Sequence, residues 1–239
     1  MNHPPAPGAS NAAVSNTVAD KPTARRRRKE ARPSELTAAA LALFGEKGFA
    51  ATRLDDVAAR AGVSKGTLYL YFDSKEALFR AVVEEGMVAA LAAAEQRLSG
   101  FQGSASELLH QLLFGWWEQI GRTPMAGVTK LIACESRNFP EVAQYYHERV
   151  ITRGRALLRH ALERGIGSGE FRPLNVEAAI DVIIAPLLML AISRFSLRLC
   201  GPQVAPETYL ETHFELLLQG LRRADPIDDR QSTATTACS

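Results

Sequence analysis

Residues 52–72 read TRLDDVAARAGVSKGTLYLYF, and this stretch predicts two short helices joined by a glycine turn. Thr52 stands three residues before Asp55, which is the spacing of a capping box at the start of a helix. The next apolar residues recur at helical spacing: Leu54, Val57, Ala58 and Ala61. Gly62 ends this helix because glycine adopts a left-handed backbone without steric cost. Ser64 is suited to cap a second helix, roughly 65–70. This order is typical of the helix-turn-helix of DNA-binding proteins.

The second helix carries the chemistry of a DNA-contacting surface. Hydroxyl groups and lysine bond to phosphate oxygens and base edges, and a glycine lets the backbone approach closely. We predict these DNA contacts: Thr52, Arg53, Ser64, Lys65, Gly66, Thr67, Tyr69, Tyr71 and Lys75. From spacing alone, a helical hairpin inside an ordinary bundle remains the alternative. For Lys75 the alternative is a structural ion pair with a nearby carboxylate.

The sequence from Leu36 to Phe79 resembles the DNA-binding domain of the TetR family of bacterial transcription regulators. The matching segments are AALALFGEKGFAAT (39–52) and LDDVAARAGVSKGTLYLYFDSKEALF (54–79). The resemblance implies an all-α protein with an N-terminal three-helix DNA-binding domain. It also implies a larger helical domain that binds a small molecule and forms a homodimer.

Composition and periodicity divide the chain into four parts. We predict a disordered basic arm at 1–32, the helix-turn-helix domain at 33–79, a helical ligand-binding and dimerisation domain at 80–224 and a disordered tail at 225–239. The first helix is expected to begin near Pro33 and Ser34, since proline suits the first helical turn. A long helix is expected from about 74 to 98. Helices of the second domain are expected near 104–121, 125–137, 139–166, 175–199 and 206–223.

Charge is distributed unevenly along the chain. Residues 21–75 hold 12 Lys or Arg against 6 Asp or Glu, a net charge of +6, whereas the whole chain has +2 and the remainder therefore −4. A basic N-terminal region on an acidic body is expected of a nucleic-acid binder. The run RRRRK at 25–29 is expected to strengthen DNA binding electrostatically. A solvated charge run is the alternative.

The last two predicted helices carry more apolar surface than one folded chain usually covers by itself. The run 182–192 is apolar around the whole helix, and the final helix has an apolar stripe. We expect a symmetric dimer interface, as the resemblance also implies, through Leu187, Leu190, Phe214, Leu217, Leu218 and Leu221. Packing within one chain is the alternative.

Aromatic, methionine and cysteine side chains of the second domain are candidates for the walls of a small-molecule pocket. The predicted pocket residues are Phe114, Trp117, Met125, Cys134, Tyr145, Tyr146 and Met189, with Trp116 and Phe139 as further candidates. Core packing is the alternative for each of them.

Other chemistries find little support. The three cysteines lack CxxC spacing and the histidines lack metal-binding spacing, so we predict no metal and no cofactor. No catalytic grouping can be argued from spacing, and we expect no enzyme. The apolar run at 182–192 is shorter than the roughly 20 residues that span a bilayer. We therefore expect a cytoplasmic protein without a membrane partner.

These patterns together predict a sequence-specific regulator of transcription. We expect a homodimeric repressor that binds a palindrome in double-stranded DNA and is released by a small-molecule effector. One alternative is a DNA-binding activator, or a regulator that answers to a protein partner. Another is an enzyme on a helical scaffold.

Overall fold

The computed structural model describes the backbone of residues 1, 24–196 and 204–222, and the side chains of residues 1, 33–194 and 204–222. These residues form helices, turns and one isolated bridge between Phe171 and Arg222, without an extended strand. The all-α prediction is therefore confirmed. The predicted disordered tail lies outside the described residues.

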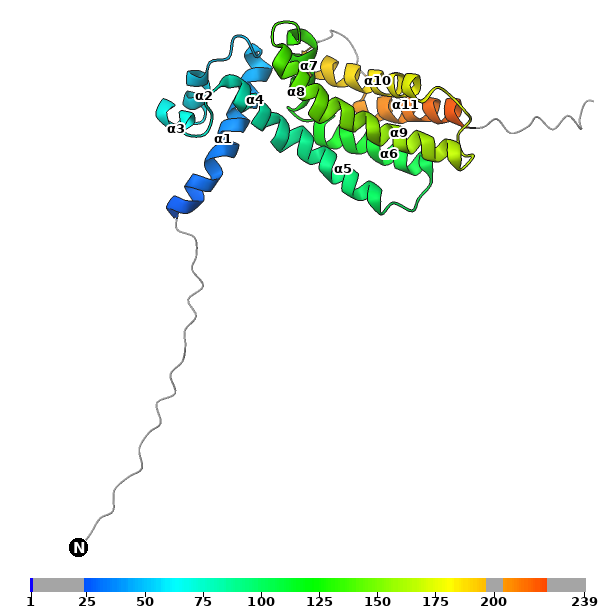
Figure 1. The fold of residues 1–239 in the computed structure, drawn as a ribbon, viewed down its shortest axis with the longest axis horizontal. Helices are drawn as coiled ribbons and strands as arrows, with labels where there is room; N and C mark the ends of the chain where they lie inside the picture. The colour runs from blue at the N-terminus through cyan, green and yellow to red at the C-terminus, as the bar shows by residue number, and fades with distance from the viewer. Residues whose placement is uncertain (2–23, 197–203, 223–239) are drawn as a thin grey trace, which may run out of the picture.

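The helices divide into a small head and a larger body (Figure 1). The head contains α1 (Ala24–Lys47), α2 (Leu54–Arg60), α3 (Lys65–Tyr69) and α4 (Lys75–Val83). The body contains α5 (Ala89–Ser99), α6 (Ala105–Trp116), α7 (Ala126–Glu135), α8 (Pro140–Tyr146), α9 (Thr152–Gly167), α10 (Val176–Ser196) and α11 (Pro206–Leu221). The order of helices agrees with the order expected from the sequence.

Wider, π-helical turns continue three of these helices. They are η1 (Glu84–Val88), η2 (Trp117–Gly121) and η3 (His147–Ile151). Through η1, α4 runs on into α5 as the long helix expected from about 74 to 98, and it carries the chain from the head into the body (Figure 1). Such turns are frequent at functional sites.

The first helix begins earlier than expected. α1 starts at Ala24, and Pro33 lies inside it, whereas the sequence placed the helix start near Pro33. Residues 24–32 read ARRRRKEAR, and Ala, Arg, Lys and Glu are all good helix formers. The basic run at 25–29 therefore occupies the first turns of α1, although its side chains lie outside the described part of the chain.

One hydrophobic core is shared by head and body. Phe49, Phe79 and Leu36 are fully buried in it, and Met125 and Tyr146 of the body are buried there as well. The ring of Phe49 lies 4.7 Å from that of Phe139, which immediately precedes α8. Head and body are therefore packed against each other through one continuous set of apolar side chains.

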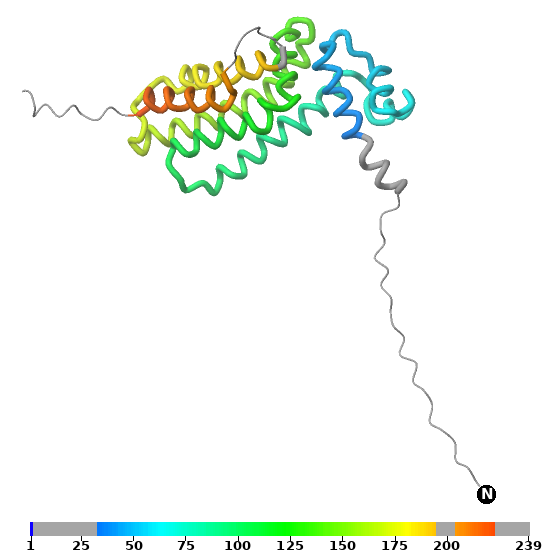
Figure 2. Tube along the Cα trace, turned by 180° about the vertical axis from the view of Figure 1, so that it is seen from behind, coloured from blue at the N-terminus to red at the C-terminus, as the bar shows by residue number. Residues whose placement is uncertain are grey.

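A second core lies wholly within the body, among α6, α9, α10 and α11. Its fully buried side chains include Leu109, Trp117, Leu162, Phe171 and Ile180. α10 and α11 lie side by side along one flank, in the front view and from behind (Figures 1 and 2). This flank carries the residues that the sequence assigned to the dimer interface.

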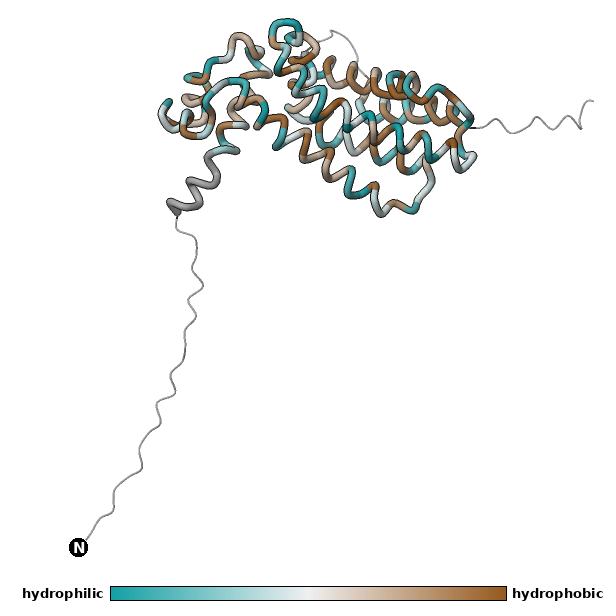
Figure 3. The backbone as a smooth tube through the Cα atoms, viewed as in Figure 1, coloured by the Kyte–Doolittle hydropathy of each residue, from teal (hydrophilic) through white to brown (hydrophobic). Residues whose placement is uncertain are grey.

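Helix α10 is mostly apolar, as the hydropathy colouring shows (Figure 3). By length and composition alone, residues 176–194 could cross a membrane. The bundle gives this composition another explanation, because different faces of the helix meet different surroundings. Ile180, Ile183 and Ala191 are buried in the second core, whereas Val182 and Met189 are 65% and 56% exposed.

Candidate nucleic-acid interface and body cavity

The turn between α2 and α3 has the geometry that the sequence predicts. Gly62 has a φ of +66°, the left-handed conformation that glycine adopts without strain. Ser64 caps α3, and its hydroxyl accepts a hydrogen bond from the Thr67 backbone N–H at 3.1 Å. Leu68 is fully buried and fixes α3 to the head. The short second helix is therefore held firmly while its outer face stays open.

That outer face presents most of the predicted DNA-binding residues to solvent. Arg53, Ser64, Lys65, Gly66 and Tyr69 are exposed, and Thr67 and Tyr71 are half-buried. The structure adds a residue that the sequence reasoning missed, because Leu70 is 83% exposed beside Tyr69. Leu68 and Phe72 are buried and stand four residues apart, so helical spacing puts Leu70 on the opposite face, and that spacing was the available signal.

Lys65 is exposed but paired. Its ammonium lies 2.9 Å from the Asp55 carboxylate and 5.9 Å from the centre of the Tyr69 ring. The hydrogen bond with Asp55 raises the pKa of the Lys65 ammonium above its ordinary value. Exposed pairs of this kind are weak, so DNA phosphate could compete for the ammonium.

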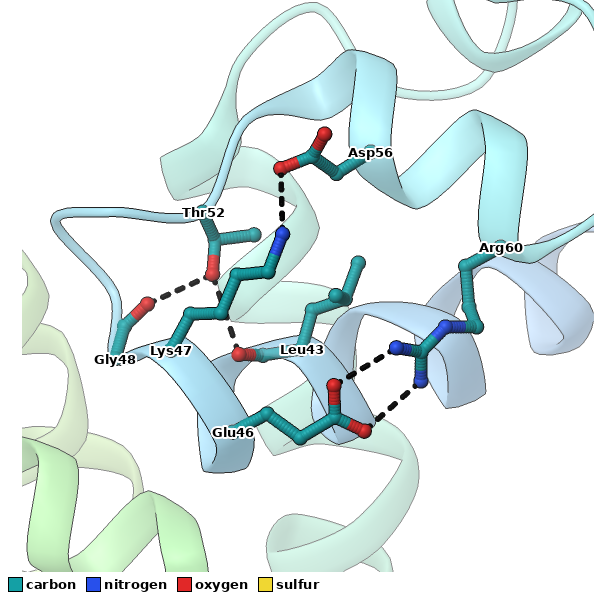
Figure 4. Close-up of polar contacts among 7 residues, drawn as sticks. All are labelled: Leu43, Glu46, Lys47, Gly48, Thr52, Asp56 and Arg60. Atoms are coloured by element: carbon teal, nitrogen blue, oxygen red, sulfur yellow. Dashed lines mark hydrogen bonds and ion pairs between the residues drawn. The ribbon is translucent and has the colours of Figure 1, made fainter.

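Thr52 corrects the sequence prediction, because it neither caps α2 nor faces solvent. It is 2% exposed, and its hydroxyl lies 2.7 Å from the Gly48 carbonyl oxygen and 3.3 Å from that of Leu43 (Figure 4). The N-cap of α2 is Arg53, without a side-chain cap. The capping-box spacing is thus a coincidence, and the Thr52 hydroxyl holds the turn between α1 and α2.

Lys75 also has a role within the head, and its predicted DNA contact stays a prediction. Its ammonium donates hydrogen bonds to the carbonyl oxygens of Phe49 at 2.7 Å and Ala50 at 3.2 Å. It also lies 4.6 Å from the centre of the Phe49 ring. Lys75 therefore ties the start of α4 to the turn after α1, and the ion pair considered as its alternative is not formed with any described side chain.

Ion pairs join α1 to α2 on the surface of the head (Figure 4). Arg60 donates to Glu46 at 3.0 and 2.7 Å, and Lys47 donates to Asp56 at 3.2 Å. The hydrogen bond with Arg60 is the main cause that lowers the pKa of Glu46. Arg60 and Lys47 are thus engaged within the head.

The body encloses a cavity of about 500 Å³ between α5, α6, α9 and α10. This volume lies in the range of small-molecule sites. Its walls are mostly apolar and include Leu91, Leu98, Leu108, Leu112, Ile132, Val150, Leu158, Ile184 and Leu188. Such a cavity can hold a small, largely hydrophobic molecule.

Only Tyr146 of the seven predicted pocket residues lines this cavity, with Trp116 from the wider set. The Tyr146 hydroxyl lies 3.3 Å from that of Thr129, and burial raises the pKa of Tyr146. Trp117 and Phe114 pack in the second core, Met125 packs in the shared core, Tyr145 bonds to Glu84, and Cys134 and Met189 are exposed. Residue type indicated that the body has a pocket, but the direction of each side chain determines whether that residue lines it.

The turn η1 connects the cavity region to the head. Glu84 accepts hydrogen bonds from the Tyr145 hydroxyl at 2.5 Å and from Arg149 Nε at 2.9 Å. The next residue, Glu85, lies 2.5 Å from the hydroxyl of Thr37 in α1. The bond from Arg149 is the main cause that lowers the pKa of Glu84. Two adjacent carboxylates thus join the body on one side and the head on the other.

Close packing at Gly86 supports the same connection. A Cβ atom at Gly86 would lie 2.4 Å from Cε of Met125, so a larger residue would displace Met125. The Met125 side chain therefore rests directly on the backbone of η1, between the head and the cavity.

The predicted dimer residues all contact the second core of their own chain. Leu187 and Leu221 are buried, and Leu190, Phe214, Leu217 and Leu218 pack against the same core within one chain. Among the described side chains, the large apolar ones that α10 and α11 leave exposed are Val182, Met189 and Leu216. The apolar stripe thus packs in part on its own chain, and its role in a dimer stays a prediction.

Metal-binding groupings are limited in the described residues. Residues 24–196 and 204–222 contain no group of three or more His, Cys, Asp or Glu side chains that could hold a metal ion. Two of the three cysteines, Cys200 and Cys238, lie outside these ranges.

Comparisons with known proteins agree with this geometry. Residues 36–82 match the family described as "Bacterial regulatory proteins, tetR family", and residues 102–196 match "Tetracyclin repressor-like, C-terminal domain". An uncharacterised helix-turn-helix regulator of Bacillus subtilis, YfiR, is 30% identical over 66% of this chain and 77% of its own length. The regulator EthR of Mycolicibacterium smegmatis is 24% identical over 88% of this chain and 98% of its own.

Solved structures share the fold. FadR from Bacillus subtilis, solved in complex with stearoyl-CoA, is 23% identical with a TM-score of 0.66 over 78% of this chain and 98% of its own. KstR2 of Mycobacterium tuberculosis, a ketosteroid transcriptional regulator, is 26% identical with a TM-score of 0.63 over 81% and 96%. With its exposed helix-turn-helix and helical body, this chain belongs to the TetR family of DNA-binding transcription regulators.

Proposed function

We propose that this protein is a homodimeric transcription repressor that binds a palindromic operator and is released when a small molecule occupies the body cavity. The observation that carries the proposal is the combination of an exposed α3 face with a cavity joined to the head through η1. The family membership supports DNA binding itself. Repression, dimerisation and release by an effector are the proposed parts.

DNA recognition would use the outer face of α3. Ser64, Lys65 and Gly66 are exposed at its start and Tyr69 at its end, which suits contact with phosphates and base edges. Arg53 is exposed at the N-cap of α2 and would add a second cation to the contact. In a twofold dimer the two α3 helices would enter successive major grooves about 34–36 Å apart, so the operator would be a palindrome.

The second subunit would pack on the flank formed by α10 and α11. Val182, Met189 and Leu216 are exposed there on two adjacent helices. A symmetric dimer covers the same patch on both subunits, so these apolar side chains would be buried together. We further propose a cytoplasmic location, where such a dimer would meet chromosomal DNA.

Release would follow from a change in the separation of the two heads. The cavity is lined by Tyr146 and Val150, which lie on either side of Arg149, the partner of Glu84. A ligand that favours a different position of η1 would shift the population of head positions. Operator affinity would then fall by at most the ratio of the ligand's affinities for the two conformations. FadR in complex with stearoyl-CoA supports a small molecule as the class of effector.

Selection of bound DNA from a random pool tests the proposal. The expected product is an inverted repeat whose half-sites lie about one helical turn apart. Recovery of unrelated sequences would refute sequence-specific binding. A selected site without twofold symmetry would refute the dimeric mode of binding.

Transcription from a promoter that carries the selected site separates repression from activation. A repressor lowers the transcript level when protein is added, and a small molecule that fills the cavity restores it. An increase in transcript on addition of the protein would favour the activator alternative. A response only to an added protein would favour regulation by a protein partner.

A further inference from the structure

We propose that the effector of the body cavity is an elongated amphiphile, with a hydrocarbon body and an acidic head group that lies beside Arg97. This inference rests on the proposed function, because it assigns a ligand class to the same cavity. It follows from the shape of the cavity and from the polar groups along its walls.

The inner walls offer little for a polar ligand to bind. Thr129 and Tyr146 are buried, and their hydroxyls lie 3.3 Å apart and are paired with each other. The remaining inner surface consists largely of Leu, Ile, Val and Ala side chains. A buried polar group needs a hydrogen-bonding partner, so a polar ligand body would be disfavoured here. The part of the ligand that fills this space is therefore hydrocarbon.

The charged residues of the lining differ in whether they are already paired. Arg155 forms ion pairs with Asp181 and with Glu177, the latter at 2.9 Å. Arg97 is exposed at the edge of the cavity, and no ion pair with another described side chain engages it. The lining has three charged residues, Arg97, Arg155 and Asp181, and among the described side chains only Arg97 has no oppositely charged partner. An acidic group on the ligand would complete that pair.

One uncharged polar side chain of α6 adds to the polar lining. Gln111 lines the same cavity and is exposed. Its amide can donate a hydrogen bond to a carboxylate oxygen. The cavity therefore has an apolar interior and polar side chains at its exposed edge, which matches a molecule with one apolar and one polar end.

The lining residues also give the cavity a long axis. On α5 they extend from Ala90 to Leu98, which spans roughly 12 Å at about 1.5 Å per residue. Ala90 lies next to η1 on the head side, whereas Arg97 lies near the far end of α5 (Figure 1). A hydrocarbon chain would thus extend from Arg97 towards Thr129 and Tyr146, near the shared core.

Binding of decanoate, 1-decanol and decylamine to the full-length protein tests the proposal. The three compounds share one alkyl chain and differ in the charge of the head group. Trp116 lines the cavity, so tryptophan fluorescence reports binding, with calorimetry as a second measurement. Decanoate is expected to bind about three- to ten-fold more tightly than either of the others, as suits one partly exposed charge-assisted contact.

Matched variants locate the head group. Arg97→Gln should weaken decanoate binding about three- to ten-fold and leave 1-decanol binding unchanged. Arg122→Gln removes the same charge from an exposed pair with Glu118 outside the lining, and it should change neither. Equal losses in both variants, or none in Arg97→Gln, would overturn the assignment of the acidic group.

A third variant locates the hydrocarbon body. Gly115 lines the cavity, and a Cβ atom there would meet nothing within 4 Å. Gly115→Leu should therefore fill part of the cavity and reduce binding of all three compounds, whereas Gly115→Ala should retain most of it. Failure of all three compounds to bind the wild-type protein would overturn the amphiphile proposal.

Operator binding by the same preparations separates this inference from the proposed function. A protein that binds its selected DNA but does not prefer decanoate refutes the ligand class alone. A protein that prefers decanoate but no DNA sequence refutes the proposed repressor while the ligand class stands.

Discussion

The Glu84 carboxylate accepts a hydrogen bond from the Tyr145 hydroxyl at 2.5 Å, across the junction between η1 and α8. Arg149 binds the same carboxylate through Nε at 2.9 Å. The helix that leaves the head is therefore fixed to the helix pair next to the cavity by one charged group.

Glu84→Gln should lower stability in a pH-dependent way. The pKa of Glu84 is lowered in the folded protein, so its contribution is present above the pKa of the unfolded chain and is lost as the pH falls through the lower folded pKa. The wild type should thus have the higher urea midpoint at pH 7, and the difference should shrink below about pH 4.5. Glu118→Gln, at an exposed pair within one helix, is the control. A difference that is constant with pH would contradict the role of the charge.

Lys65→Ala should weaken operator binding for all related sequences, because the ammonium is expected to contact phosphate. The slope of log affinity against log salt should fall by about 1. Asp55→Asn is the matched variant, since it frees the Lys65 ammonium from its pair and should bind at least as tightly as wild type.

Tyr69→Ala should cost about ten-fold in operator affinity, because its exposed ring is expected to contact a base. Wild-type binding by both Lys65→Ala and Tyr69→Ala would exclude α3 as the reading helix.

Thr52→Val should destabilise the head by about 1–3 kcal/mol, since a nearly isosteric side chain removes a buried hydroxyl and takes its hydrogen bond from the Gly48 carbonyl oxygen. The hydroxyl lies 2.7 Å from the Gly48 carbonyl oxygen. Thr212→Val removes an exposed hydroxyl bond within α11 and should change stability by less than about 0.5 kcal/mol. Denaturant unfolding measures both. Equal stability of the two variants would mean that Thr52 is not a structural residue.

Leu216→Glu should convert the proposed dimer into a folded monomer, because Leu216 is 64% exposed on the α10–α11 flank. Leu217→Glu should instead destabilise the fold, since Leu217 packs against the second core. Sedimentation velocity and circular dichroism distinguish these two effects. Val204→Glu changes an equally exposed apolar residue just before α11 and should leave the dimer intact. A dimer that persists in Leu216→Glu would place the interface elsewhere.

The sequence predicted those features that depend on backbone chemistry. Gly62 and Ser64 could be assigned because few residues suit a left-handed turn or a helix cap. Thr52 and Lys75 could not, since the same side chains bind DNA phosphate or a carbonyl of their own chain, depending on direction. Leu216 is exposed whereas Leu217 packs against the second core, and this difference in burial likewise depends on how α11 is rotated on its neighbours.

The cavity was the least predictable feature. Its walls consist largely of aliphatic residues that are common to all helical cores, so their chemistry did not mark them. Arg97 and Gly115 carried no signal until the structure placed them at the same cavity. The aromatic residues that the sequence favoured mostly fill the cores.

The shared core has a consequence for dissection of this protein. Phe49 of the head packs against Phe139 of the body, and Met125 and Val128, at and after the start of α7, belong to the same cluster as Leu36. A fragment that ended after α4 would expose these rings and aliphatic chains to water. We therefore expect that the DNA-binding portion cannot be excised as an autonomous folding unit, and that heating melts it together with the rest of the chain in a single cooperative transition.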